Sequence, residues 1–516
     1  MTVNVSDLVR EAARRDPTGV ALVEPRSERE VTWAEFDEWV DRVSRALLGL
    51  GLVAGNRVGL VMGNGIDLCA AYFGLLRGGM VAVPMSPRAT PAEIGHQVTD
   101  SQVKLVVADA DSVAQVRAAE TPGTRVVVHR VAPEEGELRF EDLLEAAPDI
   151  APVAPPDPEN LAVILYTAGA SGVPKGAMLS HRALLANIDQ VAAVEPAIIS
   201  REDVVLGLLP LSHIYGLNCV LGQSVRAGAR LVLVAAFDVE ATLRLVADHA
   251  VTVLPLAPPV IAAWAGRPGV AESLAGVRLV ISGASPLDPD VAEAFSSSTG
   301  HAVEQGYGVT EASPVLTMTV GREGPRPGSV GTPVPGVDLE LRDPLGGLAA
   351  PGDPAQVWVR GDNLFSGYWP DGTGGPGEDG WYATGDLGFL DEAGELVLVD
   401  RLREMVKVSG FTVYPTEVEE VVAEVAGVAQ VAVVGLPDER TGETVVAFVV
   451  PRDPEHGDSA ALSERVLAEC RTRLARFKVP SRVVVVAGLP HSPTGKVAKG
   501  RLRALARSEF LGIDPR

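Results

Sequence analysis

Two alternating sequence patterns in the first 310 residues constrain the fold more than any other feature. Short β-branched runs such as "RVGLVM" (57–62) and "KLVVADA" (104–110) alternate with helical patterns such as "WAEFDEWVDRVSRALLGLGL" (33–52). The alternation returns with "DVVLGLLPL" (203–211) and "VRLVISGA" (277–284). Apolar strands separated by helices are typical of βαβ units around parallel sheets. We therefore predict an α/β protein, and a chain of 516 residues should form two or more domains.

The pattern changes after about residue 328. The segment "SVGTPVPGVDLELRDPLGG" (329–347) has short strand-like runs broken by glycine and proline, which predicts antiparallel β structure and a small β-barrel. After residue 400 the chain alternates predicted helices, at 415–426 and 463–477, with predicted strands, at 428–436 and 443–450. This predicts a small C-terminal α+β domain.

Composition and charge exclude several classes of function. A formal net charge of −23 repels nucleic-acid backbones, so we expect no nucleic-acid partner. Cys69, Cys219 and Cys470 lie far apart without a C-x-x-C pair, which argues against disulfides, zinc sites and iron–sulfur clusters. The three cysteines are expected to be buried apolar fillers.

No segment has the pattern of a signal peptide or a membrane span. Residues 1–19 include acidic side chains and lack an uninterrupted apolar core. The most apolar later run, at 251–266, is shorter than the roughly 20 residues of a spanning helix and is broken by prolines. We expect a cytoplasmic protein without a transmembrane segment.

The stretch "YTAGASGVPKGAMLSH" (166–181) crowds small residues and one lysine between an apolar run and an apparent helix. Tight glycine turns can direct backbone N–H groups at a phosphate. The stretch is not a Walker A loop, because Pro174 and Gly176 flank the lysine. A plain strand–helix connection is the alternative. The residues expected to contact phosphate are Thr167, Gly169, Ser171, Gly172 and Lys175.

Four further stretches carry a family resemblance. They are "EQGYGVTEASP" (304–314), "WYATGDLGFLDEAGEL" (381–396), "VDRLREMVKVSGFTVYPTEVEE" (399–420) and "PTGKVAKG" (493–500). In this order they resemble the adenine- and magnesium-binding, ribose-binding, hinge and catalytic-lysine segments of the adenylate-forming superfamily. That superfamily contains acyl-CoA synthetases, aryl-CoA ligases, luciferases and peptide-synthetase adenylation domains. The resemblance covers nearly the whole chain.

The resemblance implies a fold and a reaction. It implies an N-terminal adenylation domain (1–399) of two α/β subdomains plus a β-barrel, and a mobile C-terminal domain (400–516) with its hinge at Asp400. A carboxylate would attack the α-phosphate of ATP to give acyl-AMP and pyrophosphate, and a thiol would then displace AMP. The implied cofactors are ATP, Mg²⁺ and coenzyme A, and the favoured substrate is a fatty acid.

Three residues receive catalytic roles from the resemblance. Glu311 matches the magnesium-associated glutamate, although a glutamate capping the N-terminus of a helix after Thr310 is the alternative. Lys496 would bridge the substrate carboxylate and the α-phosphate and neutralise the charge that develops there. His213 would lie at the mouth of the acyl pocket; a buried neutral histidine bonded to a carbonyl is the alternative.

The remaining matches are expected to bind nucleotide or pantetheine. Tyr307 would lie against adenine, with a core tyrosine as the alternative, and Asp386 and Arg401 would bond the ribose. The other expected nucleotide contacts are Gly283, Ala284, Gly306, Gly308 and Thr310. The expected pantetheine contacts are Lys407, Ser409, Gly410 and Phe411.

The chain also departs from the family pattern. Ala168 and Ala170 replace residues that are usually serine or threonine, which removes two hydroxyl donors, and Arg403 stands where many relatives have lysine. A lost hydrogen bond to a charged acceptor costs on the order of 1.5–3 kcal/mol, or about 10–100-fold in affinity. Weaker ATP binding is therefore expected, and a non-catalytic nucleotide-binding homologue remains an alternative.

The substrate is predicted from the expected pocket segments. Residues 213–223 are mostly apolar and small, which favours a fatty or aromatic monocarboxylate. Phe237 and Asp238 match the start of a surface helix rather than the buried aspartate that an amino-acid substrate would need. The thiol acceptor is expected to be coenzyme A, with a carrier-protein phosphopantetheine as the alternative.

Overall fold

The computed structural model describes most of the chain and divides into two compact units. It describes residues 3–151, 157–167, 174–321, 326, 328–350, 352–401, 404–408, 411–438, 440–453, 459–491, 495–503 and 506. Within these residues the N-terminal unit comprises 3–167, 174–339 and 359–382, and the C-terminal unit comprises 340–358 and 383–506. Each unit has hydrophobic clusters of its own.

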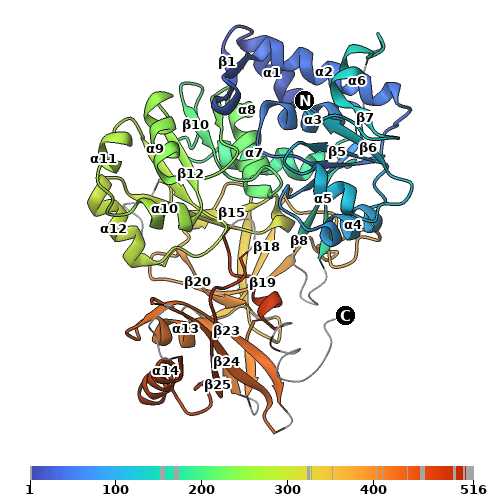
Figure 1. Ribbon diagram of the computed structural model, residues 1–516. Coiled ribbons are helices and arrows are strands. Elements are labelled where there is room, and N and C mark those ends of the chain that lie inside the picture. The colour runs from blue at the N-terminus through green and yellow to red at the C-terminus, as the bar shows by residue number, and fades with distance from the viewer. Residues whose placement is uncertain are drawn as a thin grey trace. The chain divides into compact units, whose positions relative to one another are not determined.

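Two mostly parallel sheets form the N-terminal unit, as predicted (Figure 1). The first sheet has the order β7 (Leu138–Arg139), β6 (Arg125–His129), β5 (Leu105–Asp109), β3 (Arg57–Val61), β4 (Val81–Met85), β8 (Leu161–Thr167) and β9 (Lys175–Ser180). The second has the order β16 (Thr332–Pro333), β15 (Val315–Met318), β14 (Val303–Gly308), β13 (Leu279–Ser282), β12 (Val253–Leu256), β10 (Val204–Gly207), β11 (Arg230–Leu233), β1 (Val20–Glu24) and β2 (Arg29–Thr32). Antiparallel pairing is confined to the ends of each order.

Helices connect and cover these strands. They are α1 (Asp7–Arg15), α2 (Trp33–Gly49), α3 (Ile66–Arg77), α4 (Pro91–Asp100), α5 (Val113–Ala118), α6 (Phe140–Glu145), α7 (His181–Ala192), α8 (Gln223–Ala227), α9 (Val239–Asp248), α10 (Pro258–Trp264), α11 (Val270–Ser273) and α12 (Pro289–Thr299). Short 3₁₀ helices span Pro25–Ser27 and Thr310–Ala312, and a π-helix spans Tyr215–Gly222. Helix α2 begins at a capping box, in which the Thr32 side chain accepts from Glu35 N and the Glu35 side chain accepts from Thr32 N.

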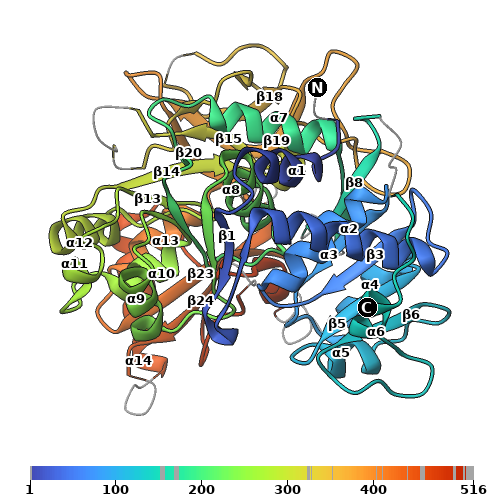
Figure 2. The same ribbon diagram turned by 90° about the horizontal axis from the view of Figure 1, so that it is seen from above.

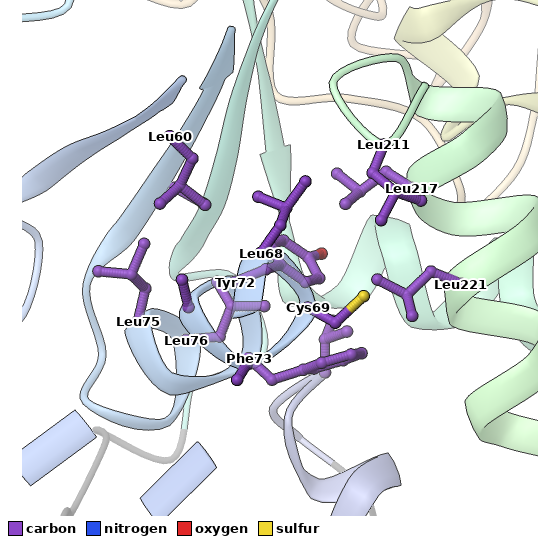
Figure 3. Close-up of a cluster of buried hydrophobic side chains, with 14 of the residues drawn as sticks. Leu60, Leu68, Cys69, Tyr72, Phe73, Leu75, Leu76, Leu211, Leu217 and Leu221 are labelled. Atoms are coloured by element: carbon purple, nitrogen blue, oxygen red, sulfur yellow. The ribbon is translucent and has the colours of Figure 1, made fainter. Parts of the chain in front are cut away.

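Helix α3 is the centre of the largest hydrophobic cluster, because all twelve of its residues are buried. It lies beside α2 (Figure 2), and a Cβ on Gly74 would lie 2.8 Å from the Cβ of Val43, so the approach of the two helices requires glycine there. The close-up shows the side chains of Cys69 and Tyr72 facing Leu217 and Leu221 (Figure 3). This cluster joins the first sheet to the π-helix.

The glycine-rich stretch joins two strands, not a strand and a helix. Lys175–Ser180 forms β9, which pairs antiparallel with β8 in a register that sets Thr167 opposite Lys175. Helix α7 begins only at His181, with Ser180 as its N-cap. The predicted strand–helix connection at this point is therefore wrong, because tertiary pairing outweighs the helix propensity of "KGAML". Residues 168–173 lie outside the described residues.

The C-terminal unit confirms the predicted α+β pattern. One sheet has the order β22 (Phe411–Val413), β21 (Val406–Val408), β24 (Gly442–Pro451) and β23 (Val428–Asp438), and β25 (Arg482–Val485) pairs with β24. Helices α13 (Pro415–Ala423) and α14 (Ser459–Arg473) pack on this sheet. Apolar side chains of β23 and β24 alternate between the two faces of the sheet, so each face has a hydrophobic cluster.

The predicted small barrel is instead an open sheet. Its order is β17 (Asp338–Arg342), β18 (Ala355–Arg360), β19 (Tyr382–Leu390) and β20 (Leu396–Arg401), with β17 and β20 as its edges. Four strands are fewer than the about five of the smallest common barrels. Within the described residues this sheet is not closed.

The sequence also makes predictions about the cysteines and about membrane spans. Cys69 and Cys470 are buried as expected, but Cys219 is partly exposed, because the π-helix places it at the margin of the core. Among the helices that the structure describes, none has the length and apolar character needed to cross a bilayer.

Candidate active site

The carboxyl ends of β13 and β14 bring several predicted nucleotide contacts together. These strands are parallel neighbours, with Ser282 opposite Gln305, so Gly283 and Ala284 emerge at the same sheet edge as Gly306–Gly308. Ala284 has a positive φ of 73°, which is uncommon without glycine. A Cβ on Gly308 would lie 2.1 Å from Pro314 O. The chain therefore folds back closely at the expected adenine segment.

Tyr307 lies within this edge and is only 7% exposed. It pairs with Thr317 across the antiparallel strands β14 and β15. Such burial suits a core tyrosine as well as one whose ring meets a purine face, so its contact with adenine stays a prediction.

Glu311 and Lys175 are linked through a tyrosine that the sequence analysis missed. The hydroxyl of Tyr368 donates to Glu311 Oε1 at 2.5 Å, and Lys175 Nζ lies 5.3 Å from the centroid of the Tyr368 ring. Glu311 lies in the first turn of the 3₁₀ helix Thr310–Ala312, as the alternative of a glutamate at a helix N-terminus also requires, so its magnesium role stays a prediction. A carboxylate, a phenol and an ammonium group thus form one connected cluster, the Glu311 cluster.

Backbone hydrogen bonds fix Tyr368 in this cluster. The segment 365–369 runs beside β9, where Met178 N donates to Gly367 O at 3.0 Å and Trp369 N donates to Gly176 O at 2.8 Å. At its other end Phe365 N donates to Glu311 O at 2.9 Å. The only sequence signal was an aromatic pair following Gly367, a position with a φ of 93°. Such a signal is too common to identify a site.

His213 precedes the π-helix and is partly buried. Its Nδ1 accepts a hydrogen bond from Tyr215 N at 3.2 Å, so a neutral His213 ring carries its proton on Nε2. This bond occupies Nδ1 only, so the predicted role at the acyl pocket and the alternative of a neutral histidine bonded to a carbonyl both stay predictions.

Tyr215 lies beside the predicted nucleotide edge. A Cβ on Gly283 would lie 2.7 Å from Tyr215 Cε1, so the ring rests against the glycine backbone, and burial raises the pKa of Tyr215. One turn later Asn218 Nδ2 donates to Ser313 O at 2.7 Å. Asn218, which no sequence motif marks, ties the π-helix to the segment that follows Glu311.

The helix start predicted at Phe237 and Asp238 is confirmed. Asp238 is the N-cap of α9, where its side chain accepts from Ala241 N at 2.8 Å. Phe237 is partly exposed next to it. This aspartate serves a helix terminus.

In the C-terminal unit the predicted ribose contacts lie on neighbouring strands. Asp386 on β19 is opposite Arg401 on β20 in the antiparallel register. Asp386 is 4% exposed, and its backbone N–H donates to Thr384 Oγ1 at 3.1 Å. The strand pairing holds the backbone of both residues in register.

Asp400 connects the same strand to α13. Asp400 Oδ2 accepts from Thr416 Oγ1 at 3.1 Å and from Thr416 N at 3.3 Å, in the first turn of that helix. A carboxylate is favourable near a helix N-terminus. The hinge at Asp400 and the predicted domain boundary stay predictions.

Lys496 lies in a tight turn of the C-terminal unit. Gly495 has a φ of 81°, which the turn requires, and an isolated bridge pairs His491 with Val497. Lys496 is partly buried, and Ala498 N donates to Pro490 O at 2.8 Å just beyond it. The predicted catalytic lysine therefore lies in a short turn, residues 495–498, which we call the Lys496 loop.

The described pantetheine candidates lie on a two-stranded ribbon. Lys407 on β21 is exposed, and Val408 pairs with Phe411 on β22. Phe411 is 57% exposed and stacks on Phe477 with a centroid distance of 4.7 Å. Predicted site residues that lie outside the described residues are Gly169, Ser171, Gly172, Ser409 and Gly410, together with the substituted positions Ala168, Ala170 and Arg403.

Comparison with known proteins defines the class. The model of the AMP-binding enzyme family matches residues 9–369, and that of the AMP-binding enzyme C-terminal domain matches residues 417–496. The chain belongs to this family of adenylate-forming enzymes and is an AMP-forming acid–thiol ligase.

Relatives of two kinds are similar over most of the chain. The chain is 35% identical to 4-coumarate–CoA ligase 5 of Oryza sativa subsp. japonica, over 96% of this chain and 93% of that protein. It is 34% identical to the long-chain-fatty-acid–CoA ligase of Escherichia coli O157:H7, over 89% and 87% respectively.

Solved structures of the class are equally similar. ATP-bound MatB from Rhodopseudomonas palustris has a TM-score of 0.87 at 30% identity, covering 99% of this chain and 100% of that one. The anthranilate CoA ligase AuaEII in complex with anthranoyl-AMP has a TM-score of 0.86 at 26% identity, covering 99% of both chains.

Proposed function

We propose that the enzyme activates an apolar monocarboxylic acid, in first place a fatty acid, as acyl-AMP and transfers the acyl group to coenzyme A. The observation that carries this proposal is the Glu311 cluster. It sets a carboxylate and an ammonium group on either side of Tyr368, near the glycine-rich stretch that resembles a phosphate loop. A departing pyrophosphate needs such cationic and metal-binding groups.

Glu311 would hold Mg²⁺. Among the described residues no three acidic, histidine or cysteine side chains form a metal-binding group. One carboxylate suffices here, because Mg²⁺ is commonly bound through one or two carboxylates and the substrate phosphates. When bound, the ion would offset the negative charge of the phosphates. Tyr368 would hold the Glu311 carboxylate in a fixed orientation, and Lys175 would attract the phosphates.

Three residues of the C-terminal unit would have roles toward the nucleotide. The neighbouring strands support the proposal that Asp386 accepts from the ribose hydroxyls while Arg401 donates to the same sugar. Lys496 would neutralise charge between the attacking carboxylate and the α-phosphate. The short loop that carries it supports such a role, since a fixed donor loses less entropy than a free side chain.

Tyr215 and His213 support an apolar acid as substrate. The Tyr215 ring against Gly283 offers an aromatic wall next to the nucleotide edge, and His213, which is bonded to Tyr215 N through Nδ1, would orient a carboxylate. The relatives include fatty-acid and 4-coumarate ligases at nearly equal identity. An aryl acid is therefore the second candidate, favoured by the flat Tyr215 surface.

The exposed ribbon of the C-terminal unit supports a thiol carried on a long arm. Phe411 exposes an apolar ring on one face of the ribbon, and Lys407 on the neighbouring strand exposes an ammonium group on the other face. The ring would suit the apolar arm of coenzyme A, and the ammonium group would suit its anionic nucleotide end. A carrier-protein phosphopantetheine shares the arm but lacks the nucleotide.

An acid panel tests the proposal. Pyrophosphate and thioester would be measured with acids from acetate through long-chain fatty acids to aryl acids, each with and without coenzyme A. We expect pyrophosphate and thioester together, with coenzyme A present and a fatty acid preferred. Pyrophosphate without thioester would instead indicate a carrier-protein thiol, and a preference for 4-coumarate or benzoate would indicate an aryl ligase.

A further inference from the structure

A second lysine, Lys499, follows Lys496 by three residues and is held inside the C-terminal unit. Its side chain is 14% exposed. Lys499 Nζ lies 2.8 Å from Glu419 Oε1 on α13 and 3.4 Å from Glu404 Oε2, which precedes β21. An ammonium group is seldom buried without such partners, because desolvation of the charge is costly.

The two carboxylates are themselves fixed. Glu419 Oε1 also accepts from Val433 N at 2.6 Å on β23, so α13, the central sheet and Lys499 meet at one oxygen. Burial alone would lower the pKa of Lys499, but the charges of Glu419 and Glu404 raise it above its ordinary value. Lys499 therefore stays charged at neutral pH.

The chain from Lys496 to Lys499 is short, and its backbone is bonded to residues 490 and 491. Val497 pairs with His491, and Ala498 N donates to Pro490 O. On the other side Leu502 N donates to Ala498 O as the final helical turn begins. The Lys499 side chain is thus an ionic attachment that joins the Lys496 loop to α13.

We propose that Lys499 is a positioning residue, which anchors the Lys496 loop to Glu419 and Glu404 so that the Lys496 ammonium reaches its place in the adenylation step. The inference rests on the proposed role of Lys496. Its consequence is specific: loss of the anchor impairs formation of acyl-AMP more than transfer of the acyl group to the thiol.

A neighbouring ion pair supplies a matched control. Lys478 Nζ lies 2.5 and 2.7 Å from the two oxygens of Glu417, also on α13, and its side chain is 23% exposed. This pair resembles the Lys499 pair in helix, chemistry and burial but has no contact with the Lys496 loop among the described interactions. Lys478→Met therefore measures the effect of losing an α13 ion pair alone.

The test compares Lys499→Met, Lys499→Arg, Glu404→Gln, Lys478→Met and Lys496→Ala in the full chain. Adenylation is measured as acid-dependent ATP–pyrophosphate exchange with the best acid of the panel. Transfer is measured separately, from the synthetic acyl-adenylate of that acid to coenzyme A. We expect Lys499→Met to slow adenylation by about 10–100-fold and transfer by no more than about twofold.

The remaining variants separate positioning from folding. Lys499→Arg should retain most adenylation, because guanidinium can bond both carboxylates, and Glu404→Gln should show a smaller loss in the same half-reaction. Lys478→Met should lower the melting temperature without a selective loss of adenylation. Equal losses of both half-reactions in Lys499→Met, or adenylation like that of Lys478→Met, would overturn the inference. Normal adenylation in Lys496→Ala would instead refute the proposed role of Lys496.

Discussion

The two units hold their proposed catalytic groups by different means. In the N-terminal unit Glu311 and Tyr368 lie on segments joined by backbone hydrogen bonds to β9 and to each other. In the C-terminal unit the Lys496 loop is attached to α13 through the ion pairs of Lys499. Backbone bonding fixes a segment independently of side-chain identity, whereas an ion pair depends on a few charged atoms. Substitutions of single side chains should therefore displace the backbone more at the Lys496 loop than around Glu311.

The largest expected effect is that of removing the Lys496 charge. Lys496→Ala should reduce ATP–pyrophosphate exchange by about 100–1,000-fold, the usual loss when one group that stabilises transition-state charge is removed. Lys104 gives a control. It is exposed and directly precedes β5, and Lys104→Ala removes an ammonium group from the N-terminal unit. Comparable exchange in both variants would refute the role of Lys496.

Tyr368→Phe should have the next largest effect. It keeps the ring beside Lys175 and removes only the hydroxyl that donates to Glu311. A hydrogen bond to a charged group contributes about 1.5–3 kcal/mol, so exchange should fall by roughly 10–100-fold, together with a weaker response to Mg²⁺. A Mg²⁺ titration of exchange separates loss of the Glu311 bond from misfolding. If Tyr368 had only a structural role, the midpoint of the titration would be unchanged in Tyr368→Phe.

The N-terminal unit also has a buried charge cluster, formed by Asp67, His129 and Arg29. Burial alone would raise the pKa of Asp67, but hydrogen bonds from His129 and Arg29 lower it to about 2. Because the folded-state pKa is below the unfolded value, this stabilisation is present above pH ~4 and is lost as the pH falls towards 2.

Asp67→Asn should therefore lower the free energy of unfolding by about 2 kcal/mol at pH 7, and the difference from the wild type should shrink below pH ~4. Urea unfolding at several pH values measures this. Asp111→Asn is the control, since its pair with Arg26 is exposed and should contribute less than about 1 kcal/mol. An equal loss at every pH would show that shape rather than charge matters at Asp67.

The smallest effect is expected at Tyr72. Its hydroxyl is buried in the apolar cluster of Figure 3, and no hydrogen-bond partner is found for it within the described part of the chain. Removing an unsatisfied buried hydroxyl is nearly neutral or stabilising. Tyr72→Phe should leave exchange unchanged and raise the melting temperature slightly. A clear loss of stability would reveal a polar contact in the core that this account omits.

Much of the fold followed from sequence because the parallel strands are buried on both faces. "RVGLVM" and "KLVVADA" became β3 and β5, and "VRLVISGA" became β13, since such continuous apolar runs suit only a covered sheet. The strand Lys175–Ser180 was missed, because its identity depends on pairing with β8 and with residues 366–369. The predicted barrel failed because local alternation predicts strands but does not determine whether a sheet closes.

The candidate site was less predictable than the fold. Its residues came from the family resemblance, not from periodicity, and the partners that hold them were not found. Tyr368 lies 57 positions from Glu311 and Lys499 lies 80 positions from Glu419, so neither contact has a local signal. Such links become visible only when the chain has folded.

A single-turnover experiment tests whether the enzyme forms acyl-AMP before the thioester. Enzyme in excess would be mixed with radiolabelled ATP, Mg²⁺ and the preferred acid, first without coenzyme A and then with it, and the adenylates would be resolved by rapid quench. We expect acyl-AMP to accumulate without coenzyme A. When coenzyme A is added, acyl-AMP should be converted to thioester and AMP. ATP that binds but never yields acyl-AMP with any acid of the panel would contradict the account and leave a non-catalytic nucleotide-binding homologue.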